Sequence, residues 1–206
     1  MLSEYRRDPN DNKLPTEDGR IQLYSQVIAD FNYEDCPGHP TWFEPLQSDH
    51  ELVDEKPFFI LIANNPGTRL HSQLDNGSLS QNSKIRGREP LRMKPADAQQ
   101  LGLADGDIVL LKNKIGSCLA GLVLDDSMKQ GVVQLATGAW FDPQKVTGHG
   151  RLCVHGNPNV LVPDKGTSAL SQGSSGQHSL VNISLWQGPL PEKTVDLPPG
   201  IVVEHK

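Results

Sequence analysis

Six short apolar runs, separated by segments rich in Gly and Pro, limit most strongly how this chain can fold. Runs of this length that are bounded by turn residues are typical of strands. The runs are FFILIA at 58–63, REPLRMK at 88–94, the two halves of DGDIVLLKNKIGSCLAGLVL at 105–124, GVVQLA at 131–136 and HSLVNISLW at 178–186. The sequence therefore predicts a mainly β fold.

One helix is expected between these strands. The segment 95–103 begins with Pro95, which suits the first turn of a helix, and Gly102 suits its end. The residues NKIG at 113–116 indicate a hairpin turn. Because so few strands would leave unpaired edges in an open sheet, we expect a small closed barrel with a short helix and long loops.

The ends of the chain differ from this central part. Residues 1–56 are polar and interrupted by Pro, and they have too little periodic apolar surface to fold alone. We expect them to form an irregular linker or wrapping arm, with a short strand at 20–24 and a helical turn at 26–30. The barrel domain is predicted over 57–186, followed by a C-terminal tail at 187–206.

Charge and composition exclude several classes of function. The formal net charge is -6 and no basic stripe is present, which argues against a nucleic-acid-binding protein. The chain has no long apolar run and no export leader, so no membrane insertion is expected. Cys36, Cys118 and Cys153 are widely spaced, which indicates ordinary, partly buried thiols rather than a metal site or a disulfide framework.

The loop NNPGTRLHSQLDNGSLS at 64–80 follows the first apolar run directly. It combines amide and hydroxyl side chains with His71 and with Arg69, whose guanidinium suits phosphate, and Gly67 allows close approach of the backbone. This set predicts a site for a polar ligand that carries phosphate. The alternative is a loop whose Asn and Ser side chains bond to their own backbone.

Three further loops are rich in small and polar residues: GAWFDP at 138–143, CVHGNPNV at 153–160 and DKGTSALSQGSSGQHS at 164–179. Long loops inside a compact domain are commonly functional. Ser168 and Gln172 could donate to phosphate, but the lysine of a P-loop is absent. A flexible linker is the alternative for this last loop.

Cys153 and His155 are two residues apart, so they would share one face of an extended segment. A thiolate–imidazole pair is therefore conceivable, but no residue is evident that would orient the histidine. A packed cysteine and a loop histidine are the expected interpretation. A small hydrolase that uses Cys153 or Ser168 stays open as an alternative.

Five longer stretches carry a family resemblance when they are taken in order. They are DGRIQLYSQVIADFNYEDCPGHPTW, ANNPGTRLHSQLDNGSL, GREPLRMKPADAQQLGLADGDIVLLKNKIGSCLAGLVL, GVVQLATGAWFDP and LCVHGNPNVLVPDKGTSALSQG. Together they resemble the C-terminal end of the dimethyl sulfoxide reductase family, and in particular its trimethylamine N-oxide and biotin sulfoxide reductases. The similarity runs over 5–185, and RLHSQ, GREP and GAW are its most specific motifs.

The resemblance implies a molybdopterin dinucleotide-binding domain whose fold is a six-stranded double-psi β-barrel. In that family two molecules of molybdopterin guanine dinucleotide hold one molybdenum, and the cofactor carries the chemistry by which oxygen is removed from an S-oxide or N-oxide. The chain would bind this cofactor as the C-terminal portion of the enzyme. The molybdenum ligand is expected upstream, so the chain should contain no catalytic or metal-ligating residue and be inactive alone.

The same resemblance assigns the cofactor-binding residues. Arg69 and Ser72 are expected to face the pyrophosphate, His71 to lie nearer the pterin, and Trp140 to pack in the cofactor surround or the core. The cofactor-binding set is Asn64, Pro66, Arg69, Leu70, His71, Ser72, Gln73, Asn157, Asn159, Ser168 and Gln172.

Partners and location are also implied by the resemblance. The remaining domains of the same reductase would be the main partner, with an electron-donor protein as a further one. The location would be periplasmic, or cytoplasmic for a biotin sulfoxide reductase, with any export signal upstream. The loop at 64–80 would face another domain and be mobile in the isolated chain. The alternative is a stand-alone double-psi barrel that binds a different ligand or a protein partner.

Overall fold

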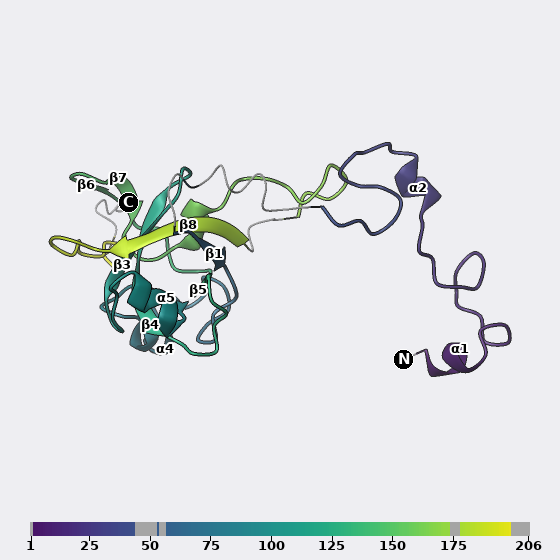
Figure 1. Ribbon diagram of the computed structural model, residues 1–206, viewed down its shortest axis with the longest axis horizontal. Coiled ribbons are helices and arrows are strands. Elements are labelled where there is room, and N and C mark those ends of the chain that lie inside the picture. The colour runs from purple at the N-terminus through teal and green to yellow at the C-terminus, as the bar shows by residue number, and fades with distance from the viewer. Residues whose placement is uncertain (1, 44–52, 54–56, 174–177, 199–206) are drawn as a thin grey trace, which may run out of the picture. The chain divides into compact units, whose positions relative to one another are not determined.

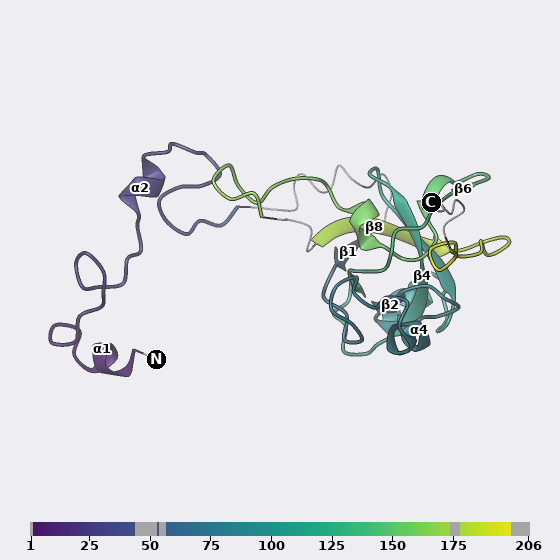
Figure 2. The ribbon, with the colours of Figure 1, turned by 180° about the vertical axis from the view of Figure 1, so that it is seen from behind.

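The computed structural model describes residues 2–43, 53, 57–173 and 178–198. Contacts divide the chain into two compact units. The first contains Met1–Glu44 and Gly166–Gly173, and the second contains Pro45–Lys165 and Ser174–Lys206. The predicted domain boundaries at residues 56 and 186 stay a prediction. The strands of the second unit are seen from two sides in Figures 1 and 2.

The second unit contains all strands of the described residues and three short helices. The predicted strands are found as β1, β2, β3, β4, β5 and β8, and the predicted helix as α5. The elements are β1 (Phe59–Ile62), α4 (Ser78–Ser83), β2 (Pro90–Met93), α5 (Pro95–Gln100), β3 (Ile108–Lys112), β4 (Ser117–Leu124), β5 (Val132–Leu135), β6 (Pro143–Val146), β7 (Gly150–Cys153), the 3-10 helix η2 (Pro158–Leu161) and β8 (His178–Leu185).

Six of the strands pair into a closed ring. β1 pairs with β5 in parallel and with β8 antiparallel, and β8 continues antiparallel to β3. β3 pairs antiparallel with β4, β4 in parallel with β2, and β2 antiparallel with β5. This mixed ring confirms the predicted six-stranded barrel. Closure leaves no strand of the ring with a free edge, as expected for a small β protein.

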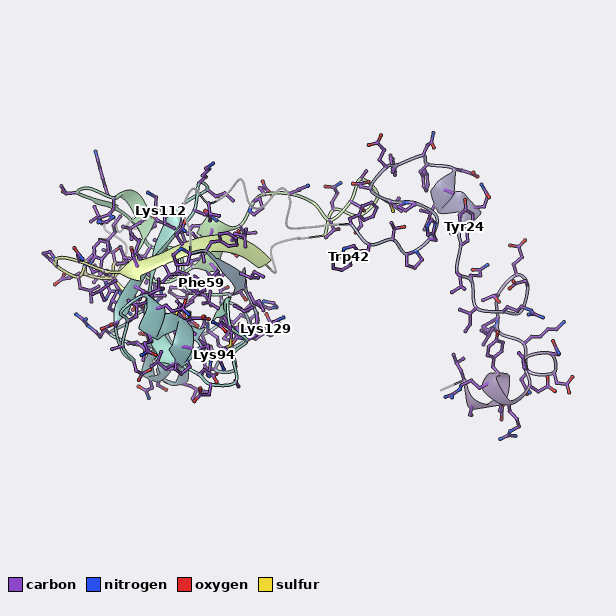
Figure 3. The ribbon with its side chains drawn as sticks, in the orientation of Figure 1. Tyr24, Trp42, Phe59, Lys94, Lys112 and Lys129 are labelled. Atoms are coloured by element: carbon purple, nitrogen blue, oxygen red, sulfur yellow. The ribbon has the colours of Figure 1, made fainter. Side chains whose placement is uncertain are left out.

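The interior of the barrel is the main hydrophobic core. Side chains alternate between the two faces of a strand, and Val109 and Leu111 of β3 point with Leu122 of β4 into this core. Figure 3 shows Phe59 within the same body of strands. The core consists of Phe59, Leu61, Leu91, Met93, Ala98, Leu103, Val109, Leu111, Cys118, Ala120, Leu122, Val133, Leu135, Cys153, Leu161, Val181 and Ile183.

A second apolar layer covers the outside of β3 and β4. Ile108, Leu110 and Leu119 occupy the alternate positions of these strands and pack with Leu152 and Val154. The hairpin of β6 and β7, which joins the ring through β4, supplies part of this layer. β3 and β4 are therefore apolar on both faces, as the continuous hydrophobic runs of their sequences require.

Some local predictions were incomplete or wrong. The hairpin of β6 and β7 and the helix α4 were not predicted, because PQKV and SLSQNS lack an apolar run of strand or helix period. The helical turn expected at 26–30 is present as α2 (Gln26–Ala29). The strand expected at 20–24 is wrong, since those residues have no regular secondary structure.

The first unit has little interior. It contains α1 (Ser3–Arg7) and α2, and the Ser25 amide donates to the Gly38 carbonyl at 2.6 Å. Figure 3 labels Tyr24 and Trp42 in this unit, and their side chains are 53% and 80% exposed. Among residues 2–43 only two glycines are buried, so this segment has no hydrophobic core of its own.

Candidate functional site

Three loops of the barrel unit surround a cavity of about 750 Å³. They are the loop after β1, the loop after β5 and the loop between β7 and β8. A volume of this size is typical of sites for small molecules and cofactors. The lining residues are Asn65, His71, Ser72, Thr137, Gly138, Ala139, Trp140, Phe141, Asn157, Asn159, Val162, Pro163 and Asp164.

The first two loops touch through their backbones. The Thr137 amide donates to the Asn64 carbonyl at 2.8 Å. Gly138 has a φ of +91°, and a Cβ atom at this position would lie 1.9 Å from the His71 carbonyl oxygen. Only glycine has both the left-handed conformation and the small size that this approach requires. Gly138, the first residue of the GAW motif, therefore allows the two loops to pack together as one wall of the cavity.

Trp140 is held at three points in that wall. Its amide N–H donates to Asp75 Oδ2 at 3.0 Å, and its indole N–H donates to the Ser72 carbonyl at 2.9 Å. Its carbonyl accepts from His155 Nδ1 at 3.1 Å. The position of Trp140 is thus set by three other residues, two of which, Asp75 and His155, do not line the cavity.

Arg69 lies beneath the loop, and its side chain is 0% exposed. Its guanidinium donates to the carbonyls of His71 and Thr137 at 3.1 and 3.0 Å, and to Ser80 Oγ at 3.1 Å. It also lies 3.1 Å from a carboxylate oxygen of Glu89. The expected direction of Arg69, toward a bound pyrophosphate, differs from this geometry, because its donors are directed at protein oxygen atoms.

Four buried charges form a ring that includes Arg69. Lys84 Nζ is 2.8 Å from Asp75 and 2.7 Å from Glu89, and Arg69 approaches the same two carboxylates at 3.4 and 3.1 Å. The side chains are 3% exposed or less. The ring of Arg69, Asp75, Lys84 and Glu89, called the charge ring below, carries two positive and two negative groups. It is therefore balanced, as buried charges require.

The charge ring keeps Asp75 ionised. Burial acts to raise the pKa of Asp75, but the hydrogen bonds from Lys84 and the Trp140 amide, together with the charge of Lys84, lower it below its ordinary value. Ser80 Oγ is a further donor at 3.2 Å. Asp75 is thus a carboxylate at neutral pH, with one oxygen toward Lys84 and Ser80 and the other toward Trp140.

His155 is a neutral residue beside the charge ring. Burial and the charge of Lys84 lower the pKa of His155 to about 4, although Asp75 and the Trp140 carbonyl oppose this shift. Its Nδ1 therefore carries the proton that is donated to Trp140. Among the described residues, His155 Nε2 and Asn64 Oδ1 are the buried side-chain polar atoms without a hydrogen-bond partner.

The third loop carries two of the predicted residues. The Asn157 side chain caps η2 by accepting from the Asn159 amide at 3.0 Å, and both residues line the cavity. Asn113 holds the end of η2 from below, because its side-chain amide donates to the Leu161 carbonyl at 2.7 Å. The cap and this buried bond fix the loop against the barrel.

A second cavity of about 400 Å³ lies on another side of the loop after β1. Asn64, Pro66 and Thr68 line it together with Gln134 and Arg92. Asn65 lines both cavities, so residues 64–68 separate them. The side chain of Arg92 is 52% exposed, and its guanidinium pairs with Asp125 at 3.0 Å.

The predicted cofactor-binding residues fall into five groups. His71, Ser72, Asn157 and Asn159 meet at the larger cavity, and Asn64 and Pro66 line the smaller one. Arg69 is in the charge ring. Leu70, which is 61% exposed, and Gln73 line neither cavity. Ser168 and Gln172 belong to the other compact unit.

The loop with Ser168 and Gln172 bonds to itself. The Ser171 amide donates to Ser168 Oγ at 2.9 Å, and the Gln172 side chain donates to the Ser168 carbonyl at 3.3 Å. The Ala169 amide donates to Asp35 of the same unit at 2.9 Å. These contacts show what holds the loop within its unit.

The alternative nucleophile has little support from the geometry. Cys153 is 1% exposed and belongs to the barrel core, and His155 donates to Trp140. Cys118 is the neighbour of Cys153 across β4 and β7, and burial raises the pKa of its thiol. No group of three or more His, Cys, Asp or Glu side chains in the described ranges could hold a metal.

None of the helices in the described ranges is long and apolar enough to cross a membrane.

Sequence reasoning missed most of the residues that shape the site. Thr137, Gly138 and Asp164 line the cavity, and Trp140, expected to pack in the cofactor surround or the core, is one of its walls. The buried partners Asp75, Lys84 and Glu89 were not singled out, and His155 was considered only as a partner of Cys153. Their signal was weak, because SLSQNSK and GREP look like polar surface, although GREP was recognised as a motif.

Comparisons with known proteins identify the family of the chain. The family described as "Molydopterin dinucleotide binding domain" matches residues 59–180, which is more than half of the chain. The chain is 41% identical over 192 residues to trimethylamine-N-oxide reductase 1 of Escherichia coli (strain K12), covering 92% of this chain and 23% of that protein. It is 42% identical over 187 residues to the dimethyl sulfoxide/trimethylamine N-oxide reductase of Rhodobacter capsulatus, covering 91% and 23%.

The chain therefore spans less than a quarter of the length of these relatives. The similarity to biotin sulfoxide reductases stays a prediction. Among solved structures, acetylene hydratase from Pelobacter acetylenicus resembles the fold, with a TM-score of 0.63 and 22% identity over 87% of this chain and 25% of that chain. The barrel, its loops and the matched residues 59–180 show that the chain belongs to the molydopterin dinucleotide binding domain family.

Proposed function

We propose that the chain binds molybdopterin guanine dinucleotide as the C-terminal portion of a molybdenum-dependent S-oxide or N-oxide reductase. The observation that carries the proposal is the cavity of about 750 Å³, where loops predicted from separate motifs meet. The family match supports a dinucleotide as its ligand. The trimethylamine N-oxide and dimethyl sulfoxide reductases among the relatives support the reaction class.

The donors around the cavity fit a dinucleotide. Ser72, Asn157 and Asn159 offer neutral hydrogen-bonding groups, and His71 can donate to an anion. Trp140 and Phe141 offer aromatic surface to a flat ring system. The lining residues include no Lys or Arg, so within this cavity a pyrophosphate would be held by neutral donors and His71.

Arg69 has an indirect role in this proposal. Its guanidinium is buried and bonds to the backbone of both loops that line the cavity. It therefore orients His71 and Thr137 rather than touching phosphate. Leu70 and Gln73 are exposed beside the cavity, where they would contact a further part of the enzyme.

Other parts of the reductase complete the proposal. The cofactor supplies the oxygen-atom chemistry when bound, and this chain contributes binding and orientation. The remaining domains of the same reductase would cover the cofactor and provide the molybdenum ligand. An electron-donor protein is a further proposed partner, and a periplasmic location is proposed from the reductases among the relatives.

A domain exchange tests the proposal. The corresponding part of the Escherichia coli trimethylamine-N-oxide reductase is replaced by this chain, and molybdenum content and trimethylamine N-oxide reduction are measured. We expect the hybrid to load molybdenum and to reduce the substrate. Asn159→Leu, at the cavity, should lower the molybdenum content, whereas Asn82→Leu, an exposed position outside both cavities, should not.

Two outcomes would contradict the proposal. One is a folded hybrid that contains no molybdenum, which would favour a binding module for a different ligand. The other is an equal molybdenum content in the Asn159→Leu and Asn82→Leu hybrids, which would place the cofactor away from this cavity.

A further inference from the structure

The charge ring joins three segments that are separate in sequence. Arg69 and Asp75 belong to the loop after β1, Lys84 follows α4, and Glu89 precedes β2. Through Thr137 and Trp140 the ring also reaches the loop after β5. It therefore connects both loops that form the wall of the larger cavity, although none of its four side chains lines that cavity.

We propose that the charge ring is a positioning device, with Asp75 as its central residue, that sets the place of Trp140 and thereby the shape of the cavity. This inference rests on the proposed function for its consequence in ligand binding. Its structural part, the placement of Trp140, is independent of any ligand.

Asp75 is central because one of its carboxylate oxygens faces the charge ring and the other accepts from Trp140. Oδ1 accepts from Lys84 at 2.8 Å and Ser80 at 3.2 Å, and lies 3.4 Å from Arg69. Oδ2 accepts from the Trp140 amide at 3.0 Å. An amide in place of the carboxylate has one oxygen, so it cannot satisfy both sets of donors. One set would face an NH₂ group.

The backbone of the loop shows that this placement opposes local preference. His71 and Leu74 have φ values of +49° and +58°, a region that non-glycine residues seldom adopt. Such conformations persist where surrounding contacts determine them. Arg69 supplies one such contact at the His71 carbonyl, and the Ser80 and Gln81 side chains bond to Asp75 immediately after Leu74.

The decisive variant is Asp75→Asn in the 206-residue chain. Amide hydrogen exchange is followed by NMR at Trp140 and at Leu111, which lies in the central strand β3. A positioning role predicts that Trp140 exchanges at least about tenfold faster, as expected for loss of one charged hydrogen bond, while Leu111 is unchanged. A role in global stability alone would accelerate both amides alike.

A milder variant keeps the test available if Asp75→Asn does not fold. Ser80→Ala removes the hydroxyl that bridges Arg69 and Asp75 and leaves all four charges in place. It should accelerate Trp140 selectively by a smaller factor. Asp125→Asn is the matched control, because it makes the same chemical change in the exposed pair with Arg92. The control should leave the exchange of Trp140 unaltered.

Ligand binding gives a second readout. Guanosine diphosphate is titrated into the wild-type chain and the folded variants, and Asp75→Asn is expected to weaken its binding about tenfold. If wild-type chain does not bind guanosine diphosphate, the proposed function is contradicted, but the exchange of Trp140 still decides the placement. The inference is overturned if neither Asp75→Asn nor Ser80→Ala accelerates the exchange of the Trp140 amide relative to that of Leu111.

Discussion

A single histidine couples the site to pH at the residue scale. His155 is buried, and its pKa is about 4 in the folded chain against 6.5 for an ordinary histidine. Between these values the unfolded chain binds more protons at this position than the folded chain does. The free energy of unfolding therefore decreases as the pH falls from 6.5 to 4. Above pH 6.5 His155 is neutral in both states, so it causes no loss of stability there.

His155→Asn tests this dependence. An asparagine keeps a donor for the Trp140 carbonyl but does not titrate. The wild-type free energy of unfolding should fall by up to about 1.4 kcal/mol per pH unit between pH 6.5 and 4 because of His155, and the variant should lack this part of the slope. Urea unfolding at several pH values measures it. Equal slopes in the variant and the wild type would show that His155 is not the titrating group.

Gly138 is the residue on which the contact of the two loops depends. Gly138→Ala places a methyl group against the His71 carbonyl at a position with φ of +91°. We expect a loss of about 2 kcal/mol or more in stability, together with weaker binding of guanosine diphosphate. Gly148→Ala is the matched control, because Gly148 has a φ of +82° but no atom near its Cβ position.

The comparison of these two variants separates strain from contact. Both variants force an alanine into the left-handed conformation, but only Gly138→Ala pushes the loop after β1 away from the loop after β5. If the two variants lose the same stability and bind guanosine diphosphate equally well, the close approach of His71 and Gly138 does not shape the cavity.

Single residues also show the limit of sequence reasoning about the site. Arg69 was chosen because a guanidinium suits phosphate, and its type and its loop are those expected. Its direction depends on Glu89 and Thr137, which are 20 and 68 positions away in sequence. A pattern within one loop cannot contain such contacts. Long-range contacts of the same kind tie the loop at 64–80 to buried groups, and its mobility in the isolated chain stays a prediction.

At the scale of elements, the segment after β8 is attached to the barrel. Residues 187–206 were predicted as a tail, and of these 187–198 are described. The Thr194 amide and hydroxyl donate to Asp142 at 2.7 and 2.6 Å. Arg88 donates to the Pro191 carbonyl, and Gln144 donates to the Glu192 carbonyl at 2.6 Å. The segment thereby supports the end of the loop that carries Trp140.

Thr194→Val tests this support. The variant keeps the shape of the side chain but removes one donor from buried Asp142, so stability should fall by about 1 to 2 kcal/mol. The change should be greatest near neutral pH, since hydrogen bonds from Thr194 lower the pKa of Asp142 against the effect of burial. Chemical unfolding measures the loss. A stability equal to that of Thr147→Val, an exposed threonine, would contradict the role.

Elements with a continuous apolar run could be predicted from the sequence, and those without one could not. β3 and β4 were predicted because IVLL and CLAGLVL form continuous apolar runs, as strands buried on both faces require. α5 was visible from Pro95 and Gly102. β6 could not be seen, because Pro143, Gln144 and Lys145 are polar or break strands, and its partner β7 is the reason that it is extended. Tertiary pairing overrode local preference there.

At the scale of the whole molecule, the first unit lacks what the barrel unit has. Ile21, Leu23 and Val27 are 55%, 75% and 70% exposed, and no hydrophobic residue between 2 and 43 is buried. A segment that buries so little apolar surface cannot offset its conformational entropy. The relatives are similar over 92% of this chain, which must include most of this segment. We therefore infer that its apolar side chains contact the domains that the longer relatives have in addition.

Limited proteolysis of the isolated chain tests this inference. Chymotrypsin should cleave within residues 3–43, after aromatic residues such as Tyr24 and Phe31, and should leave a resistant fragment that contains the barrel. Removal of the segment should leave the unfolding midpoint of the barrel unchanged. Protection of Tyr24 and Phe31 from cleavage in the isolated chain would contradict the inference.

We propose that loops from three parts of the barrel unit form one site for the nucleotide half of the cofactor. The most direct measurement is an NMR titration of the ¹⁵N-labelled chain with guanosine diphosphate. We expect the chemical-shift changes to concentrate at the amides of Asn65, His71, Ser72, Trp140 and Asn157, while Leu111 and the exposed loop at Gly148 stay unchanged. Shifts confined to other surfaces, or the absence of shifts at millimolar nucleotide, would contradict it.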